Sequence, residues 1–340
     1  MNLGFWENLP RPFWALAPME DVTDIAFRQM FARHGRYKDP KSSSDDRASA
    51  DGNLRGPDVL WTEFTSADGL LKGGWERLKH QLFYEENERP IVVQLFSAHP
   101  DRMMQAAKLC VELGFDGIDI NMGCPSSTVV SNGCGCDLIR NPELAQDLIR
   151  AAKEGAGEVP VSVKTRTGFN ESQIEDWVPQ LLSAKPAVLI MHGRTRKQMS
   201  KVPNDWDEIA RVVEIRDQLE SETLIVGNGD ITSLEQGENR AQETGVEGIM
   251  VGRGAFGNPW FFNPNINYDD LSAEDRLGVM VEHARTFDEL LPNQHFAIMR
   301  KHFKAYTSGL PASNELRDEL MEADDSEEVA DIVERYLSSN

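Results

Sequence analysis

Residues 117–125 read GIDINMGCP, a short apolar run followed by a glycine, a cysteine and a proline. Brief runs of apolar and β-branched residues are typical of β-strands, so we expect a strand at Gly117–Asn121. The glycine and the proline then predict a turn that holds Cys124 just beyond the strand. A reactive side chain is therefore expected at the end of a buried strand.

Runs of the same kind recur along the chain, and amphipathic stretches of helical length separate most of them. This alternation is typical of the α/β class, in which helices connect parallel strands. Eight strands over about 240 residues favour a (β/α)8 TIM barrel over a doubly wound sheet, which remains the alternative architecture. The expected strands are Phe13–Ala17, Val59–Phe64, Ile91–Phe96, Gly117–Asn121, Val161–Thr165, Val188–His192, Leu224–Gly227 and Gly248–Val251.

Two segments interrupt this rhythm. Residues 38–56 are polar and nearly free of bulky apolar side chains, so we expect a mobile, solvated insertion at the N-terminal face of the barrel, away from catalysis. Residues 271–337 show a purely helical pattern, and Ser272 is suited to begin the first helix. We therefore expect a barrel domain over residues 1–262 and a small α-helical domain over residues 271–340.

The composition is that of a soluble globular protein, with 40% hydrophobic and 27% charged residues. No stretch approaches the roughly 20 apolar residues of a membrane helix. The N-terminus lacks a basic region and is interrupted by Pro10 and Pro12, so we expect no signal peptide. Four cysteines do not make a disulfide framework in a chain of 340 residues, which predicts a reducing, cytoplasmic location.

The net charge of −21 is unfavourable for binding nucleic acid, unless positive charge is gathered locally. Two windows contain no Asp or Glu, namely residues 178–204 and 290–314. Chance gaps in a patchy surface are the alternative explanation. The basic residues of the two windows are Lys185, Arg194, Arg196, Lys197 and Lys201, and then Arg300, Lys301 and Lys304, which lie with His295 and His302.

Polar side chains stand at the C-terminal ends of most predicted strands, where TIM-barrel enzymes hold their active residues. A structural core does not require this pattern, so we interpret the set as one site. In strand order it comprises Pro18, Met19 and Glu20, then Gln94, Asn121 and Cys124, Lys164 and Arg166, His192 and Arg194, Asn228, Gly229 and Asp230, and Gly252 and Arg253.

This set suits a flavin. Turns at Gly229 and at Gly252–Gly254 leave backbone N–H groups free to bind a phosphate, at the position where barrels usually bind one. Lys164 offers a cation to the ring edge on which negative charge accumulates during reduction. Gln94 can donate to and accept from the pyrimidine edge of the ring.

The chain resembles the tRNA-dihydrouridine synthase family over essentially its whole length. The resemblance implies an FMN-binding barrel, a helical tRNA-binding domain and an NADPH or NADH electron donor. It implies that Cys124 is the catalytic cysteine. It also implies that FMN is contacted by Pro18, Met19, Glu20, Gln94, Lys164, His192, Asn228, Gly229, Asp230, Gly252 and Arg253. The matching segments are APMEDVTDIAFR (17–28), TEFTSADGL (62–70), DINMGCP (119–125), VKTRTG (163–168), HGRT (192–195), GNGDI (227–231), VGRGAFGNPW (251–260) and MRKHFKAY (299–306).

Saturation of the uracil C5–C6 bond requires a hydride at C6 and a proton at C5. A thiol is a workable acid at neutral pH, and we predict that Cys124 is that acid rather than a small buried hydrophobic residue. Cys110 lies on the apolar face of a helix and is expected only to pack. Cys134 and Cys136 have poor metal-ligand spacing and no histidine nearby in sequence, so we expect no metal site.

The expected substrate is tRNA, bound by a chain that acts as a monomer. Two alternatives remain: an FMN barrel oxidoreductase for a small pyrimidine or enone, and a non-catalytic tRNA-binding factor. The sequence departs from the family pattern at Asp21, Cys136, Ser200 and Val202, where Gly, a small residue such as Ala, Tyr and Gly are usual. The residues expected to contact RNA are Asn121, Arg166, Arg194, Arg196, Lys197, Arg300, Lys301 and Lys304.

Overall fold

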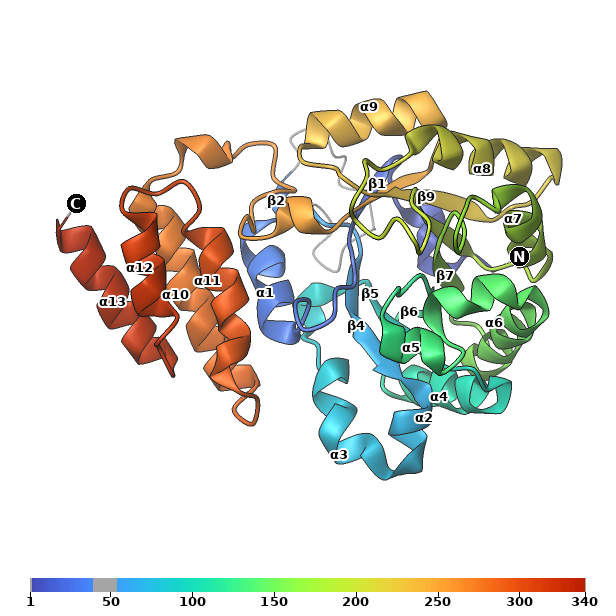
Figure 1. Ribbon diagram of the computed structural model, residues 1–340, viewed down its shortest axis with the longest axis horizontal. Helices are drawn as coiled ribbons and strands as arrows, with labels where there is room; N and C mark the ends of the chain where they lie inside the picture. The colour runs from blue at the N-terminus through green and yellow to red at the C-terminus, as the bar shows by residue number, and fades with distance from the viewer. Residues whose placement is uncertain (1, 39–53, 340) are drawn as a thin grey trace.

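The computed structural model describes residues 2–38 and 54–339, and its centre is one sheet of eight parallel strands (Figure 1). The strands follow the order β1-β10-β9-β8-β7-β6-β5-β4. A parallel bridge between Ala15 and Val59 joins the two edges, so the sheet curls round until its first and last strands meet. The TIM-barrel prediction is confirmed, and the doubly wound alternative is wrong.

Each of the eight predicted strands is present, with ends that differ from the prediction by at most two residues. The short apolar runs therefore located the strands well. The observed strands are β1 (Phe13–Leu16), β4 (Leu60–Ser66), β5 (Ile91–Phe96), β6 (Gly117–Met122), β7 (Val161–Arg166), β8 (Val188–His192), β9 (Leu224–Asn228) and β10 (Gly248–Val251).

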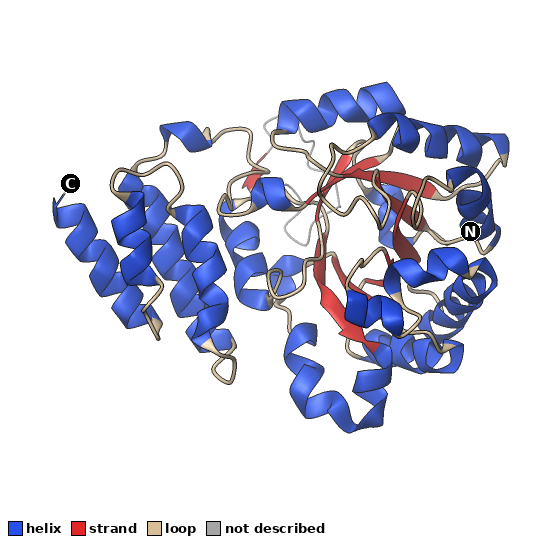
Figure 2. Cartoon of the chain, viewed as in Figure 1, coloured by secondary structure: helices blue, strands red, loops and turns tan. Residues whose placement is uncertain are grey.

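Helices surround the strands, as Figure 2 shows. The larger ones are α1 (Ile25–His34), α4 (Pro100–Glu112), α6 (Pro142–Ala156), α7 (Ile174–Ser183), α8 (Trp206–Gln218) and α9 (Leu234–Thr244). Between β4 and β5 the chain makes an excursion through α2 (Ala67–Gly69), a π-helical turn η2 (Leu70–Gly74) and α3 (Trp75–Leu78). The short helix α5 (Ser127–Ser131) follows β6, and the remaining short helical turns are η1 (Gly4–Asn8), η3 (Lys79–Leu82), η4 (Glu86–Glu88), η5 (Gly135–Arg140), η6 (Arg253–Ala255) and η7 (Tyr268–Asp270).

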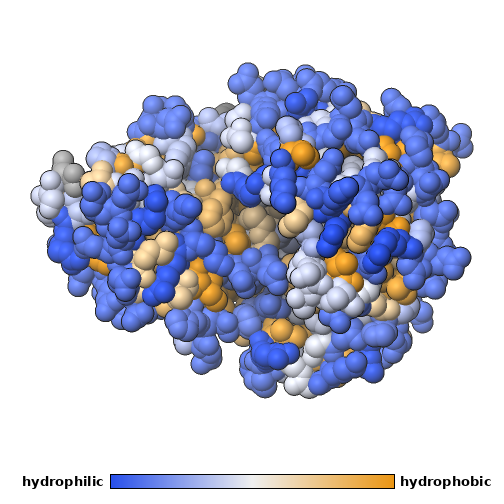
Figure 3. Space-filling view, viewed as in Figure 1, coloured by the Kyte–Doolittle hydropathy of each residue, from blue (hydrophilic) through white to orange (hydrophobic). Residues whose placement is uncertain are grey.

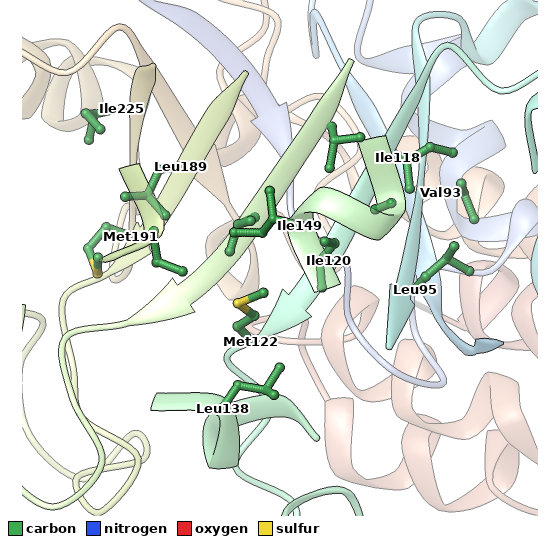
Figure 4. Close-up of a cluster of buried hydrophobic side chains, with 14 of the residues drawn as sticks. Val93, Leu95, Ile118, Ile120, Met122, Leu138, Ile149, Leu189, Met191 and Ile225 are labelled. Carbon is green, nitrogen blue, oxygen red and sulfur yellow. The ribbon is translucent and has the colours of Figure 1, made fainter. Parts of the chain in front are cut away.

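The strands bury side chains on both faces. Residues that point outward pack against the helices and form the largest core cluster, which includes Val93, Ile120 and Leu189 (Figure 4). Residues that point inward form a second cluster, which Trp6 of η1 joins at the N-terminal end of the strands. Because side chains alternate along a strand, the inward positions are free to become polar at the other end without disturbing the outer core.

The described ends of the predicted insertion include two short strands. Tyr37–Lys38 (β2) pairs with Leu54–Arg55 (β3) in an antiparallel ribbon, so the ends of the predicted loop are strands and the prediction was wrong there. The two short strands were missed because two residues each are too few to show a period. Residues 39–53, which make up most of the expected mobile insertion, lie outside the described residues.

The C-terminal helices form a bundle beside the barrel (Figure 1). Ser272 and Asp275 form a capping box at the start of the first helix, which confirms the predicted start. The bundle has its own hydrophobic core, to which Ile25, Ala26 and Met30 of α1 contribute from the barrel side. Its elements are α10 (Ala273–Leu290), η8 (Phe296–Met299), α11 (Arg300–Tyr306), α12 (Ser313–Leu320) and α13 (Ser326–Ser339).

The surface is largely polar. Figure 3 shows hydrophilic residues over most of the viewed face, with apolar residues gathered in a hollow between the bundle and the barrel. Within residues 2–38 and 54–339, no helix is both long and apolar enough to cross a membrane.

Candidate active site

A cavity of about 670 Å³ lies at the C-terminal ends of the strands. This volume falls within the range of roughly 300–1,000 Å³ that is common for small-molecule sites. All eleven residues predicted to bind the cofactor line it, together with Asn121, Cys124, Arg166 and Arg194. The other five residues predicted to contact RNA do not line the cavity. They are Arg196, Lys197, Arg300, Lys301 and Lys304.

The alternation of side chains along the strands places this set on one surface. On β7, Ser162, Lys164 and Arg166 share the inward face, while Val161 and Val163 join the outer core. On β8 the inward residues change from Val188 and Ile190 to His192 as the strand approaches the cavity. The inner face is thus apolar near the N-terminal end of the barrel and polar where the cavity opens.

A hydrogen-bond relay connects a buried carboxyl group to the turn that carries Cys124. Ser162 Oγ and Gln94 Nε2 donate to the two carboxyl oxygens of Asp119, at 2.5 and 2.6 Å. Asn121 Nδ2 donates to Gln94 Oε1 at 2.9 Å, and Asn121 Oδ1 accepts the N–H group of Cys124 at 2.8 Å. The relay fixes the amide of Asn121 against the cysteine turn, so the predicted substrate contact also has a holding role.

Cys124 is held on both sides of its side chain. Its carbonyl oxygen accepts the N–H group of Cys136 at 3.1 Å, and Cys136 Sγ donates to the carbonyl oxygen of Gly123 at 3.0 Å. Gly135 is required here, because its φ is +59° and a Cβ atom would lie 2.7 Å from the carbonyl oxygen of Cys124. Burial raises the pKa of the Cys124 thiol, so it is protonated at neutral pH.

The cavity is cationic although the chain is strongly acidic. Lys164 Nζ donates to Asn228 Oδ1 at 2.9 Å, and burial together with nearby Arg166 lowers the pKa of Lys164 to about 8. Burial and the surrounding cations also lower the pKa of His192, which leaves its ring neutral at pH 7. Asp230 is the acidic partner of Arg194 and Arg253: although partial burial opposes the shift, its hydrogen bond from Arg194 lowers its pKa.

Arg166 connects two loops at the cavity wall. Its Nε donates to the carbonyl oxygen of Gly123 at 2.8 Å, next to Cys124. A terminal nitrogen donates to the carbonyl oxygens of Thr195 and Met199, at 3.3 and 3.2 Å. The side chain is 8% exposed, so the guanidinium acts as a clamp between the cysteine turn and the loop after β8.

Two glycine turns, one after β9 and one after β10, pack against each other. Gly229 has a φ of +133°, which only glycine adopts readily. A Cβ atom on Gly254 would lie 2.0 Å from the carbonyl oxygen of Ile231, so the second turn can approach the first only because it lacks a side chain. This close approach brings the backbone of both turns to one end of the cavity.

Comparison with known proteins decides the family. A family model described as dihydrouridine synthase (Dus) matches residues 15–340. The chain belongs to the dihydrouridine synthase family. Dihydrouridine synthases are oxidoreductases, and the resemblance noted in the sequence is confirmed.

Relatives match over their full length. The chain is 35% identical to a probable tRNA-dihydrouridine synthase of Staphylococcus epidermidis, covering 99% of this chain and 97% of that protein. It is 36% identical to a probable tRNA-dihydrouridine synthase 2 of Bacillus subtilis, with the same coverage. A solved 2-naphthoyl-CoA reductase complex is 8% identical, with a TM-score of 0.53 over 73% of this chain and 49% of that one, and shows the barrel fold alone.

The basic residues that this dihydrouridine synthase carries outside the cavity differ in their surroundings. The Arg196 guanidinium lies 5.2 Å from the ring centre of Phe169, and Lys197 is exposed. Arg300 faces Asp324 at 3.8 Å, and Lys304 is exposed. Lys301 is the exception, because its Nζ donates to a backbone carbonyl of the barrel, that of Asp21, at 2.5 Å.

One residue of the second acid-free window, residues 290–314, does not lie at the surface as expected. His302, which the sequence grouped with Arg300, Lys301 and Lys304, is fully buried and stacks near Phe27 and Phe256. The sequence placed it at the surface because the window was defined only by the absence of Asp and Glu, which does not show the direction in which each side chain points. His302 therefore contributes to the junction between bundle and barrel.

Two features of the site were missed from the sequence or seen only as oddities. Asp119 was not proposed as a functional residue, although an acid between Ile118 and Ile120 in a buried strand is an unusual pattern. Asp21 has a φ of +54°, which explains why glycine is usual at this position in the family.

The other three cysteines, Cys110, Cys134 and Cys136, do not line the cavity. Cys110 is fully buried in the outer core, as predicted. Within residues 2–38 and 54–339, no group of three or more His, Cys, Asp or Glu side chains has the geometry to hold a metal ion.

Proposed function

We propose that the protein is an FMN-dependent tRNA-dihydrouridine synthase that takes its electrons from NADPH or NADH. The observation that carries the proposal is the cavity itself: a cationic pocket with a protonated thiol at one wall, in a chain that matches the family from residue 15 to residue 340. The names of the full-length relatives support tRNA as the substrate.

The residues present fit FMN. Four cationic side chains line the cavity against two acids, Glu20 and Asp230, so it favours an anionic ligand; the cations are Lys164, Arg166, Arg194 and Arg253. Lys164 would face the electron-rich edge of the ring, and the backbone of the Gly229 and Gly252 turns would hold the phosphate with Arg253. We assign Pro18, Met19, Glu20, Gln94, His192, Asn228 and Asp230 to the remaining contacts, because they line the same cavity.

When bound, FMN supplies the hydride that C6 of the uracil base accepts. The side chains of the protein supply the rest of the reaction. The Cys124 thiol donates a proton to C5, and burial favours this role because the raised pKa keeps the proton on sulfur until it is needed. Asn121 and Arg166 keep the thiol in place by binding the N–H and the carbonyl group of the peptide bond between Gly123 and Cys124.

The RNA has to present its uridine to this cavity, which requires the base to leave the stack. We propose that Arg196 and Lys197 on the loop after β8, and Arg300 and Lys304 on α11, contact RNA phosphates on opposite sides of the cavity. We assign residues 271–340 to an RNA-binding unit and expect the protein to act as a monomer, because one chain supplies the site and both surfaces.

The test is to incubate the FMN-loaded protein with NADPH and unmodified tRNA and to quantify dihydrouridine after digestion. We expect dihydrouridine in tRNA and no reduction of free uracil. Reduction of free uracil without any change in tRNA would instead support the small-molecule oxidoreductase. A protein that binds tRNA and does not take up FMN would support the non-catalytic factor.

A further inference from the structure

The loop between β1 and α1 carries three residues of the cavity wall, Pro18, Met19 and Glu20. The loop is a compact turn: the carbonyl oxygen of Met19 accepts the N–H groups of Val22 and Thr23, at 3.1 and 3.0 Å. Thr23 Oγ1 accepts the N–H group of Met19 at 3.0 Å and is fully buried. The shape of this turn therefore sets where Met19 and Glu20 lie.

Asp21 is an exposed residue of the turn, and its backbone meets other elements on two sides. On one side lies Glu63, a residue of β4 that is 5% exposed: burial raises its pKa to about 8, and the nearby N–H group of Asp21 acts in the opposite direction. On the other side, the carbonyl oxygen of Asp21 accepts Lys301 Nζ of α11 at 2.5 Å, from the helical bundle. The left-handed backbone at Asp21, with a φ of +54°, is strained for a non-glycine residue, so these two contacts hold a conformation that the residue itself disfavours.

The surroundings of Lys301 are acidic. Glu20, Asp21, Asp24 and Glu63 bring four carboxyl groups to the turn, and Lys301 acts on Glu20 and Asp24 in the direction that favours their charged forms. Arg28 is the other cation nearby, and it is already bonded to Glu88 and to the carbonyl oxygens of Thr23 and Phe83.

We propose that Lys301 is a positioning residue: it ties the helical bundle to the β1–α1 turn and thereby holds Met19 and Glu20 in the cofactor-binding conformation. This inference rests on the proposed function, because the ligand of that wall is FMN. It separates Lys301 from Arg300 and Lys304, with which the sequence had grouped it as an RNA contact. RNA held by the bundle is then connected to the cofactor site through the Lys301 side chain, in addition to the packed junction between bundle and barrel.

The test measures FMN affinity by quenching of flavin fluorescence in four proteins: the unaltered chain, Lys301→Met, Lys301→Arg and Arg335→Met. Arg335 is the control, because it also lies on a helix of the bundle and loses one positive charge, from an exposed ion pair with Glu319. We expect the dissociation constant for FMN to rise about tenfold in Lys301→Met and to stay unchanged in Arg335→Met. In Lys301→Arg it should lie close to the value of the unaltered chain.

Equal FMN affinity in the unaltered chain and Lys301→Met would overturn the inference and leave the proposed function standing. Failure of the unaltered chain to bind FMN would overturn the proposed cofactor and the inference with it. A loss that Arg335→Met shares would show a general effect of charge and would also overturn the positioning role.

A second measurement does not depend on FMN. Hydrogen exchange of the ligand-free chain reports the N–H groups of Val22 and Thr23, which the turn protects through Met19. We expect these amides to exchange faster in Lys301→Met than in the unaltered chain, with no change in Arg335→Met. Unchanged exchange at both amides would contradict the inference even if the variant were less stable overall.

Discussion

At the scale of single residues, Cys124 shows how a common side chain becomes a specific acid. Burial is the main cause that raises its pKa, and the charge of Glu20 adds to it. The nearby cations Arg166 and Lys164 act in the opposite direction and do not prevail. The backbone contacts from Asn121 and Cys136 restrict where the sulfur can go. The combination gives a thiol that keeps its proton and has a fixed position.

For Cys124→Ala we predict that FMN binding and reduction by NADPH persist, while formation of dihydrouridine falls at least 100-fold, since general acids contribute roughly 10²–10⁴-fold. The measurement is single-turnover reduction of tRNA beside stopped-flow bleaching of the flavin. Cys110→Ala is the control, because Cys110 is buried in the outer core and should affect stability but not the rate. Normal turnover of Cys124→Ala would show that another group donates the proton.

Lys164 leads to a prediction about pH. Its pKa of about 8 in the ligand-free protein means that its positive charge is present below pH 8 and is lost as the pH rises through that value. The electron-rich edge of the ring then loses its cationic partner, so the dissociation constant of FMN should rise about tenfold between pH 7 and pH 9, one pKa unit being worth a factor of ten.

The check is a series of FMN titrations across this pH range with Lys164→Met and Lys108→Met, the latter an exposed lysine on α4. Lys164→Met should bind FMN weakly at every pH and show a flat profile, whereas Lys108→Met should follow the unaltered chain. A pH dependence that survives in Lys164→Met would assign it to a different group.

At the scale of elements, the junction between α1, α10 and α11 buries two histidines. His283 and His302 lie with their ring centres 4.7 Å apart, and neither ring nitrogen of His302 has a hydrogen-bond partner among the described residues. Burial lowers the pKa of His283 to about 3 and that of His302 well below its usual value. Both rings are therefore neutral in the folded protein and must be charged when the chain unfolds in acid.

The sign of the effect follows from linkage. A histidine whose folded pKa is depressed stabilises the fold fully above its unfolded pKa of about 6.5, and this stability is lost as the pH falls below that value. From pH 6.5 to pH 5 the loss amounts to about 2 kcal/mol for one such group. We predict that His302→Phe, which keeps an aromatic ring between Phe27 and Phe256, reduces this acid loss by about that amount.

Urea denaturation of the unaltered chain and of His302→Phe at pH 6.5 and pH 5 measures the difference. His99→Phe is the control, because the side chain of His99 is 61% exposed. Identical acid sensitivity in the unaltered chain and in His302→Phe would mean that other groups dominate the loss.

The same scale shows what the sequence could reveal. Strands such as Gly117–Met122 were found because their apolar runs are long enough to stand out, and the residues at their ends followed from the barrel geometry. The partners of those residues could not be found in this way. Lys301 and Asp21 are 280 residues apart in the sequence, and Arg166 and Gly123 are 43 apart. Such contacts depend on the tertiary structure and on the side-chain conformations, which the sequence pattern does not show.

At the scale of the whole molecule, a net charge of −21 repels RNA at long range. Repulsion of this kind extends over about 8 Å at physiological salt, so binding must rely on contacts made inside that distance. Exposed cations at the rim, such as Lys197 and Lys304, are suited to this role. The acidic residues on the rest of the surface then restrict RNA to the face on which these cations lie.

We therefore predict that the double variant Arg300→Glu with Lys304→Glu binds tRNA at least tenfold more weakly at 0.15 M salt and keeps its FMN. Each lost phosphate contact should also reduce the slope of log affinity against log salt by about one. The matched control reverses Arg285 and Arg335, which pair with Glu327 and Glu319 and lie on or beside the outermost helix α13 (Figure 1). This control changes the net charge by the same amount. An equal loss of tRNA affinity in both double variants would assign the effect to overall charge. An unchanged salt slope in Arg300→Glu with Lys304→Glu would show that α11 does not contact the RNA.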